Sequence, residues 1–275
     1  MTAEAVRFAF GANWSNFLRH LDDERIAEAE RSLLNSLGKN GIAGKRFLDV
    51  GSGSGLFSLA AHRLGAARVH SFDFDQQSVA CTAELRTRFA NGPANWIVEK
   101  GSALDDAYLA SLGAWDVVYS WGVLHHTGDM WSALNNVARL VAPGGTLFIA
   151  IYNDQGRTSR LWHVVKRTFN RGAAGRLLVE STFIPYWSMR AFLLDVFRFR
   201  DPRRRYRDYK KTRGMSLLHD WVDWLGGYPF EVARPEEVFR FFRDRSFVLR
   251  EITTCGGGLG CNEYVFVGAE ETRIA

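Results

Sequence analysis

The stretch over residues 47–58 constrains the fold of this chain more than any other part of it. It begins with an apolar run at 47–50, which predicts a short buried strand of a parallel sheet. Alternating glycines follow at Gly51, Gly53 and Gly55. Because glycine adopts positive φ angles and has no side chain, these positions predict a tight turn that a ligand can approach closely. A strand, a glycine turn and a helix start together indicate an α/β fold.

Polar side chains around this turn predict a binding site. Ser52 and Ser54 are expected to cap the helix that opens near Leu56, and its backbone N–H groups should face a docked polar group. A lone glycine run is equally typical of an ordinary strand–helix turn. However, Asp49 lies at the carboxyl end of the strand, where open α/β sheets bind ligands. Asp73 ends the next apolar segment, from which a carboxylate binds ribose hydroxyls in dinucleotide folds.

Three further motifs follow in order, at residues 115–120, 121–126 and 140–147. With the glycine turn they give residues 45–152 a pattern that resembles the class I S-adenosylmethionine (SAM)-dependent methyltransferases. The glycine spacing differs from that of a nicotinamide-binding fingerprint, whose third glycine comes one residue later. The resemblance implies a Rossmann-like fold and SAM as the cofactor, and it does not identify the substrate.

The resemblance also implies where each part of SAM binds. Its carboxylate and ammonium groups are expected at the backbone around Gly51 and Gly53, its ribose at Asp73, and its adenine at Phe74 and Ser102. The family often holds an acidic residue at the position of Ser102, which leaves that contact open. The expected cofactor residues are Asp49, Gly51, Ser52, Gly53, Gly55, Asp73, Phe74, Ser102, Ala103 and Trp121.

Methyl transfer is an in-line displacement, so it needs positioning and water exclusion more than catalytic groups. His125 and His126 are the candidate general bases, because the unperturbed pKa of histidine is near 6.5. The alternative is that one histidine packs and the other caps a helix. Tyr152 and Asn153 can hydrogen-bond a substrate or the cofactor amino group. The rings of Trp121 and Tyr152 are candidates for cation–π contact with the sulfonium.

Strands and helices alternate beyond the glycine turn, which predicts a doubly wound, seven-stranded, mostly parallel sheet with helices on both faces. Strands are expected near 46–51, 68–73, 95–99, 115–120 and 146–152, and helices near 55–64, 76–89, 105–112 and 130–141.

We expect four segments: an N-terminal helical cap (1–42), a SAM-binding core (43–152), an insertion (153–232), and a last helix with an antiparallel strand pair (233–275). The aromatic part of the cap, which includes Trp14, is expected either to cover the cofactor or to pack on the core. The insertion is rich in aromatic residues and arginine, and it leaves the fifth strand where the substrate should lie. The candidate substrate residues are Trp14, Tyr186, His219 and Tyr228. For a role in catalysis, Tyr186, His219, Tyr228 and Glu231 of the insertion are weaker candidates than the residues at the strand ends.

Charge and composition limit the partners. The net charge is +5, but nine basic and two acidic residues lie within 198–213 alone. Because the basic charge is confined to this run, it argues against a nucleic-acid-binding protein. The sequence also lacks the motif that marks methylation of a flipped base. No apolar run reaches the roughly 18 residues of a membrane span. The three cysteines favour neither disulfides nor a metal site, so we expect a cytoplasmic protein. We expect a small-molecule substrate, and the basic run leaves open that it is acidic or bound to a carrier.

Three functions fit these features. The first is a SAM-dependent methyltransferase acting on a small molecule or biosynthetic intermediate. The second is an enzyme similar to azetidine-2-carboxylate synthases, which close the aminobutyryl arm of SAM on its own amine and release methylthioadenosine. The third is a SAM-binding regulator without turnover. Because fold does not fix function, only product analysis separates them. The sequence leaves the acceptor and the oligomeric state open.

Overall fold

The computed structural model describes residues 8, 11, 14, 18, 21–38, 40–90, 95–201 and 217–270. The chain divides into two units. The core unit comprises residues 11–155 and 231–275, and the helical unit comprises residues 156–230 together with residues 1–10. The helical unit shares residues 156–230 with the expected insertion at 153–232, and the core unit includes residues 11–42 of the expected cap. The division into a cap, a core, an insertion and a last segment stays a prediction.

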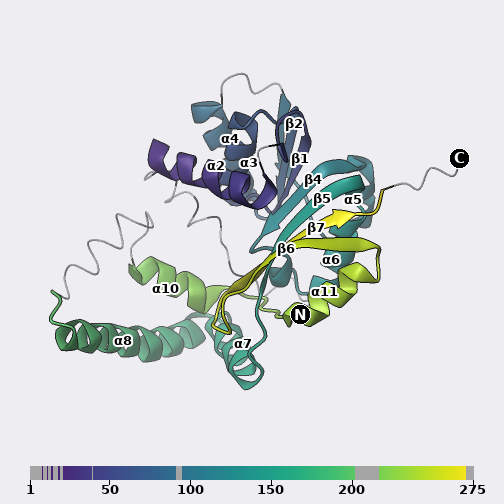
Figure 1. Ribbon diagram of the computed structural model, residues 1–275. Coiled ribbons are helices and arrows are strands. Elements are labelled where there is room, and N and C mark those ends of the chain that lie inside the picture. Colours follow the sequence, from purple (N-terminus) through teal and green to yellow (C-terminus); the bar gives the residue numbers. More distant parts are fainter. Residues whose placement is uncertain are drawn as a thin grey trace, which may run out of the picture. The chain divides into compact units, whose positions relative to one another are not determined.

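A seven-stranded sheet forms the centre of the core unit, in the order β3-β2-β1-β4-β5-β7-β6 (Figure 1). Its strands are β1 (Arg46–Val50), β2 (Arg68–Asp73), β3 (Trp96–Lys100), β4 (Trp115–Trp121), β5 (Val141–Tyr152), β6 (Phe247–Thr253) and β7 (Cys261–Gly268). The first five strands are parallel, and β7 pairs antiparallel with both β5 and β6. The predicted doubly wound, mostly parallel sheet is confirmed.

Helices cover both faces of this sheet, as Figure 1 shows. One layer consists of α2 (Asp23–Leu37), α3 (Leu56–Arg63) and α4 (Gln76–Phe89), and the other of α5 (Asp106–Leu112), α6 (Met130–Ala138) and α11 (Pro235–Arg243). Alternate residues of each strand enter different cores: Phe47 packs under the first layer, and Leu48 and Val50 pack under the second. This alternation follows from the two-residue period of a strand.

Side-chain caps fix where several helices begin. The side chain of Asp22 accepts from Arg25 N–H at the start of α2, and the side chain of Asp75 accepts from Gln77 N–H at the start of α4. Each satisfies a donor that the first helical turn leaves without an intrahelical partner. The predicted cap by Asp75 is confirmed, and Gly38 ends α2 with a φ of +82°.

One strand boundary differs from the prediction. The sequence predicts that the fifth strand begins near residue 146, whereas β5 already begins at Val141. Val141 pairs with Trp115, and the register then shifts before Thr146 pairs with Val117. The proline and two glycines are therefore accommodated as an irregularity within the strand, which is where sheets tolerate them.

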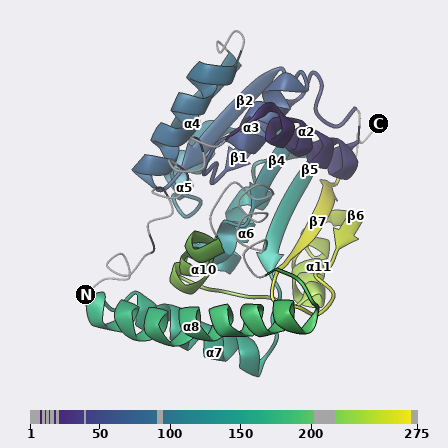
Figure 2. The same cartoon turned by 90° about the vertical axis from the view of Figure 1, so that its left-hand side faces the viewer.

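The helical unit contains α7 (Arg157–Phe169), α8 (Ala173–Phe197) and α10 (Leu217–Gly226). Helices α7 and α8 lie side by side in Figures 1 and 2. A small core of its own joins them, formed by Val165, Phe169, Val179 and Leu225 with flanking aromatic rings. Among the described residues, no helix combines the length and the apolar character needed to cross a membrane.

Candidate functional site

The glycine turn after β1 is held by the end of β2. Gly51, Gly53 and Gly55 have φ angles of +79°, +55° and +79°. The N–H groups of Gly51 and Ser52 both donate to the Phe72 carbonyl, at 2.8 and 3.1 Å. These two donors are therefore occupied within the protein.

Neighbouring side chains leave no room for a Cβ on this turn. A Cβ at Gly51 would lie 2.3 Å from the Val123 side chain, and one at Gly55 would lie 2.8 Å from the Thr82 side chain. Gly55 is itself the N-cap residue of α3 and uses no side-chain cap, while the Ser52 hydroxyl pairs with Thr82 Oγ1 at 3.0 Å. The expectation that Ser52 and Ser54 cap this helix is therefore wrong, because the left-handed Gly55 takes the cap position.

Asp73, at the end of β2, holds the turn through its side chain. Its two carboxylate oxygens accept the N–H groups of Gly53 and Asp75, each at 2.9 Å. Burial raises the pKa of this carboxyl to about 6, against the lowering effect of these hydrogen bonds. A carboxylate offers about four acceptor positions, so Asp73 retains capacity for hydroxyl groups of a ligand.

Asp49, at the end of β1, is a second buried carboxyl group beside the turn. Only 3% of its surface is exposed. The Ser58 hydroxyl lies 2.5 Å from its Oδ2 and 2.7 Å from the Ser71 hydroxyl. Burial raises the pKa of Asp49 to about 7. A buried carboxyl group with so high a pKa is one that a nearby cation would ionise.

The residues expected around adenine follow β2 and β3. Phe74 is 41% exposed, and Lys100 Nζ lies 5.9 Å from the centroid of its ring. The Ser102 hydroxyl accepts the backbone N–H two residues further on, and the buried Ala103 accepts Asn136 Nδ2 at its carbonyl. An exposed ring and a hydroxyl that can still donate suit a flat heterocycle.

The two histidines of the 3-10 helix η3 (Leu124–His126) differ in exposure. His125 is fully buried, its ring centroid lies 4.0 Å from that of Tyr152, and its Nδ1 accepts the Tyr152 N–H at 3.4 Å. His126 is only half-buried and meets the Tyr152 ring edge-on at 5.5 Å. Of the two candidate bases, His126 is thus the one with exposed surface, and His125 braces the end of β5.

Three more predicted residues lie at the ends of β4 and β5. Trp121 Nε1 donates to Glu263 Oε1 at 2.8 Å, so the indole reaches across β5 to β7. Asn153 donates its N–H to the Gly260 carbonyl, and its Oδ1 accepts from Asn262 Nδ2 at 3.1 Å. Trp121, Tyr152 and Asn153 are thus held at the carboxyl ends of the strands, at the edge that the glycine turn also occupies.

Trp14 lies against the glycine turn. A Cβ at Gly53 would be 3.0 Å from Cε2 of the indole, and the Gly11 N–H donates to Asp75 Oδ2 at 3.0 Å. Both contacts are within the core unit, and they place this part of the N-terminal segment next to the turn and the start of α4.

Comparison with known proteins identifies the family. The model of a family described as a methyltransferase domain matches residues 18–196, which is more than half of the chain. The chain belongs to the class I SAM-dependent methyltransferases. The family indicated by the motifs, its fold and its cofactor, SAM, are therefore confirmed.

Similar proteins cover only parts of this methyltransferase. A methyltransferase of uncharacterised function from Mycobacterium tuberculosis is 34% identical over 117 residues, 42% of this chain and 55% of that protein. A ubiquinone biosynthesis O-methyltransferase from Parvibaculum lavamentivorans is 34% identical over 114 residues, 39% of this chain and 40% of that protein. The chain thus spans about half the length, or less, of these curated relatives.

Solved structures share the fold at low identity. An O-methyltransferase family protein from Burkholderia thailandensis aligns with a TM-score of 0.56 and 12% identity, over 89% of this chain and 57% of that one. A magnesium protoporphyrin IX methyltransferase from Synechocystis, solved with S-adenosylhomocysteine, aligns with a TM-score of 0.52 and 14% identity. The alignment covers 90% of this chain and 83% of that one.

The predicted substrate residues of this methyltransferase are divided between the units. Tyr186 is exposed on α8, the Tyr228 ring lies 5.7 Å from that of His163, and for His219 on α10 only the backbone is described. All three belong to the helical unit and stay predictions. Glu231 belongs to the core unit, where its carboxylate accepts the N–H groups at residues 128 and 130 and so caps α6.

Two residues that brace the site escape the sequence prediction. The Thr82 hydroxyl donates to the Gly53 carbonyl, and Ser58 donates to Asp49. Ser58 follows the glycine turn by one helical turn, so the sequence does offer a signal for it. Thr82 comes from the middle of α4 and becomes a neighbour only when the sheet is wound, which no local pattern indicates.

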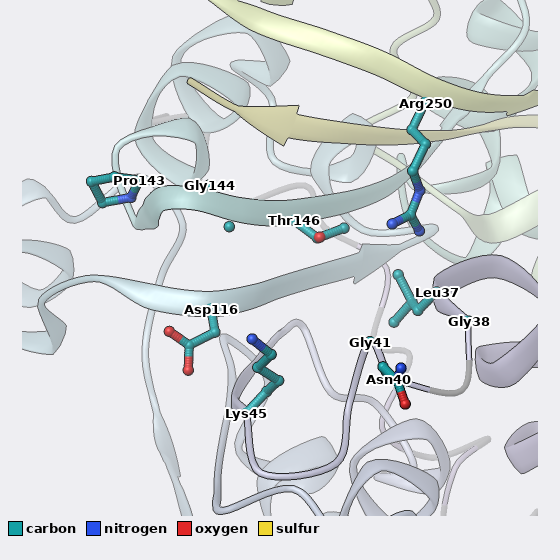
Figure 3. A pocket seen from close by; sticks show the side chains of 11 residues that line it. Leu37, Gly38, Asn40, Gly41, Lys45, Asp116, Pro143, Gly144, Thr146 and Arg250 are labelled. Atoms are coloured by element: carbon teal, nitrogen blue, oxygen red, sulfur yellow. The ribbon is translucent and has the colours of Figure 1, made fainter. Parts of the chain in front are cut away.

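A cavity of about 500 Å³ lies at the other edge of the sheet (Figure 3). Lys45, Asp116 and Arg250 are among the residues that line it, together with the 143–146 segment of β5. Lys45 precedes β1 and Asp116 is near the start of β4, so this cavity is at the amino ends of the strands. Open α/β sheets bind their cofactors at the carboxyl ends, and we therefore do not assign SAM to it.

Proposed function

We propose that this chain transfers the methyl group of SAM to a hydroxyl group of a small biosynthetic intermediate. The observation that carries this proposal is the pair of buried carboxyl groups on either side of one glycine turn, Asp49 after β1 and Asp73 after β2. Both have pKa values raised by burial, to about 7 and about 6. A cationic, hydroxyl-rich ligand would ionise both and offset the cost of burying them.

SAM has groups that match these residues. We assign its ribose hydroxyls to the remaining acceptor positions of Asp73 and its ammonium group to Asp49 and the carbonyl oxygens of the turn. Gly51, Ser52, Gly53 and Gly55 form the turn beside it, and we assign adenine to Phe74 with Ser102 and Ala103. The indole of Trp121 faces the sulfonium, to which an aromatic face is attractive.

The chemistry itself requires little of the protein. SAM supplies an electrophilic methyl group, and the protein must align the acceptor and exclude water. We assign Trp14, which lies against Gly53, the role of shielding the glycine turn from solvent. Tyr152 and Asn153 position the acceptor at the end of β5, and His126 accepts the proton that the hydroxyl loses. His125 acts indirectly, through its contact with Tyr152.

The acceptor class rests on the relatives. Several of them are named as O-methyltransferases of ubiquinone biosynthesis, but they match only about two fifths of this chain. That similarity supports a hydroxyl group on a biosynthetic intermediate as the acceptor. Product analysis with a panel of acceptors decides which small molecule it is and whether a carrier holds it.

Product analysis also tests the reaction itself. The full chain is incubated with SAM alone and then with a panel of phenols and other hydroxyl compounds, and the nucleosides are separated chromatographically. We expect S-adenosylhomocysteine only when an acceptor is present. Methylthioadenosine formed from SAM alone, above the spontaneous background, would instead indicate cyclisation of the aminobutyryl arm. SAM binding with neither product across the panel would favour a regulator.

Asn153→Ala sharpens the test, with Asn135→Ala as the matched control, because Asn135 lies on α6 and its Oδ1 accepts from Arg245 Nε, beyond the end of α11. For methyl transfer, Asn153→Ala should slow acceptor turnover and leave SAM affinity nearly unchanged. For cyclisation, it should abolish the acceptor-free formation of methylthioadenosine.

A further inference from the structure

Helix α8 is apolar on two opposite faces. One face packs into the core of the helical unit through Val179, Phe183 and Trp187. The other carries large apolar side chains that are between 50% and 61% exposed: Leu178, Tyr186, Met189, Phe192, Leu193 and Val196. A helix that is apolar all round is normally buried, so the outer face of α8 requires an explanation.

The spacing of these residues makes the outer face continuous. Leu178, Met189, Phe192 and Val196 are separated by intervals of three, four or eleven residues, which place them on one side of a helix. Tyr186 and Leu193 widen the same side. Single exposed apolar residues are ordinary, but a contiguous exposed patch marks a contact surface.

The inner face fixes how α8 can use this surface. The rings of Phe183 and Trp187 lie 5.4 and 6.0 Å from that of Trp162 on α7. These contacts anchor the middle of the helix to its unit through the inner face and leave the outer face out of the core of that unit. Such a helix would lie along a surface with one side immersed.

Positive charge directly follows this face. Arg198 and Arg200 are exposed and flank Phe199, whose side chain is 99% exposed. They begin the run at 198–213 with its nine basic and two acidic residues. A basic run next to an exposed apolar helix face is the combination that binds anionic lipid surfaces.

We propose that the outer face of α8, with Arg198 and Arg200 that follow it, binds the surface of an anionic lipid bilayer. The apolar side chains enter the boundary between headgroups and acyl chains, and the arginines contact the lipid phosphates. A second copy of the chain would bring an equally basic run, whereas the headgroups supply the opposite charge. This inference is independent of the acceptor that the core unit methylates.

Vesicle sedimentation with the full chain tests the proposal, without SAM. We compare vesicles of phosphatidylcholine alone with vesicles enriched in phosphatidylglycerol. The wild type should bind the anionic vesicles, and less strongly as the salt concentration rises. The variant Phe192→Asp with Val196→Asp should lower the partition coefficient at least about tenfold. Because both residues are exposed, their replacement should leave the thermal melting curve close to that of the wild type.

Matched variants show whether the effect is specific. Val248→Asp with Ile252→Asp replaces two exposed apolar residues of β6 in the core unit and should leave vesicle binding unchanged. Arg198→Glu with Arg200→Glu should weaken binding to the anionic vesicles and remove much of its salt dependence. This charge pair also serves if the α8 variant fails to fold.

Several results would overturn the inference. One is a wild type that does not bind anionic vesicles. Another is an equal loss of vesicle binding in the α8 variant and the β6 variant. A third is unchanged vesicle binding in both the α8 variant and the arginine variant. Self-association by light scattering that the α8 variant abolishes, without vesicle binding, would assign the face to a second copy instead. None of these results would change acceptor-dependent formation of S-adenosylhomocysteine, so this test and that of the proposed function fail separately.

Discussion

The backbone N–H of Gly53 donates to the carboxylate of Asp73 over 2.9 Å, which joins the turn after β1 to the end of β2. The second carboxylate oxygen accepts the Asp75 N–H, at the start of α4. One side chain therefore holds the glycine turn and the next strand–helix junction in register. We have assigned the ribose of SAM to the same carboxylate, so the shape of the turn and the affinity for the cofactor should depend on one residue.

Replacing Asp73 tests this dependence. Asp73→Ala removes the charged acceptor of the ribose hydroxyls, and such a hydrogen bond contributes about 1.5–3 kcal/mol. SAM affinity, measured by calorimetry, should fall at least about tenfold. Asp73→Asn keeps one neutral oxygen as an acceptor, so its SAM affinity should lie between that of Asp73→Ala and that of the wild type.

A cap elsewhere in the core unit provides the control for Asp73. Asp129 caps α6 through the Ser132 N–H and lies on another helix. Asp129→Ala should cost about 1 kcal/mol of stability and leave SAM affinity unchanged. If Asp73→Ala also left the affinity unchanged, the assignment of ribose to this residue would be wrong.

The raised pKa of Asp49 predicts pH-dependent binding. Burial raises this pKa from 3.8 to about 7, so the carboxyl group is largely protonated below about pH 6. An ammonium group binds the ionised form, and SAM affinity should therefore rise roughly tenfold between about pH 5.5 and pH 7. Calorimetry in buffers of different ionisation enthalpy should show protons released on binding.

Asp49→Asn removes the titrating group. Its SAM affinity should be weaker than that of the wild type at about pH 7 and should depend much less on pH. The stability of the free protein should respond in the opposite sense: a carboxyl group with a raised pKa contributes stability at low pH that is lost as the pH rises through about 7. A wild type whose affinity is constant over this range would refute the contact between Asp49 and the ammonium group.

Much of the core unit can be predicted from the sequence, because its determinants are local. The apolar runs that form β1, β2 and β4 are short and bounded by glycine or aspartate, and Asp75 sits where a cap must sit. The same locality explains why the sequence alone indicates Asp73 as a candidate ribose ligand. Its position at the end of the second strand follows from the chain order.

The parts that cannot be predicted depend on contacts between distant segments. Nothing near Thr82 in the sequence indicates that its hydroxyl reaches the Gly53 carbonyl, or that Glu231 caps a helix a hundred residues earlier. The local pattern favours Ser52 as a cap of α3, but its hydroxyl pairs with Thr82 instead. The outer face of α8 is hidden for a related reason: aromatic residues in a sequence look the same whether they pack inward or outward.

Because the two histidines differ in exposure, we expect their replacement to have different effects. His126→Gln removes the proposed proton acceptor, so kcat for acceptor methylation should fall at least about hundredfold while SAM affinity stays the same. The loss of the acidic limb of the pH–rate profile would distinguish a base from a packing residue. His125→Gln should instead lower the melting temperature, because His125 is fully buried against Tyr152. Equal kinetic defects without a change in the pH profile would contradict these roles.

In the helical unit, Lys166 of α7 should make stability depend on pH in the sense opposite to that of Asp49. Its side chain is fully buried, its Nζ donates to the Trp224 carbonyl, and Nζ lies 4.2 Å from the centroid of a Trp224 ring and 5.0 Å from that of Phe230. Burial lowers the pKa of this amine from 10.5 to about 7. The folded protein thus binds fewer protons here than the unfolded chain does between these two values.

Stability should therefore rise with pH at this residue. The difference in bound protons corresponds to about 1.4 kcal/mol between about pH 6 and pH 8, and Lys166→Met should lose this contribution. Urea titrations at both pH values give the unfolding free energy of the wild type and of Lys166→Met. The change with pH in the difference between the two proteins measures the contribution of Lys166. Lys45→Met, at an exposed lysine of the core unit, is the matched control and should show no such difference. If Lys166→Met kept the full pH dependence of the wild type, the buried amine would not be the group that titrates.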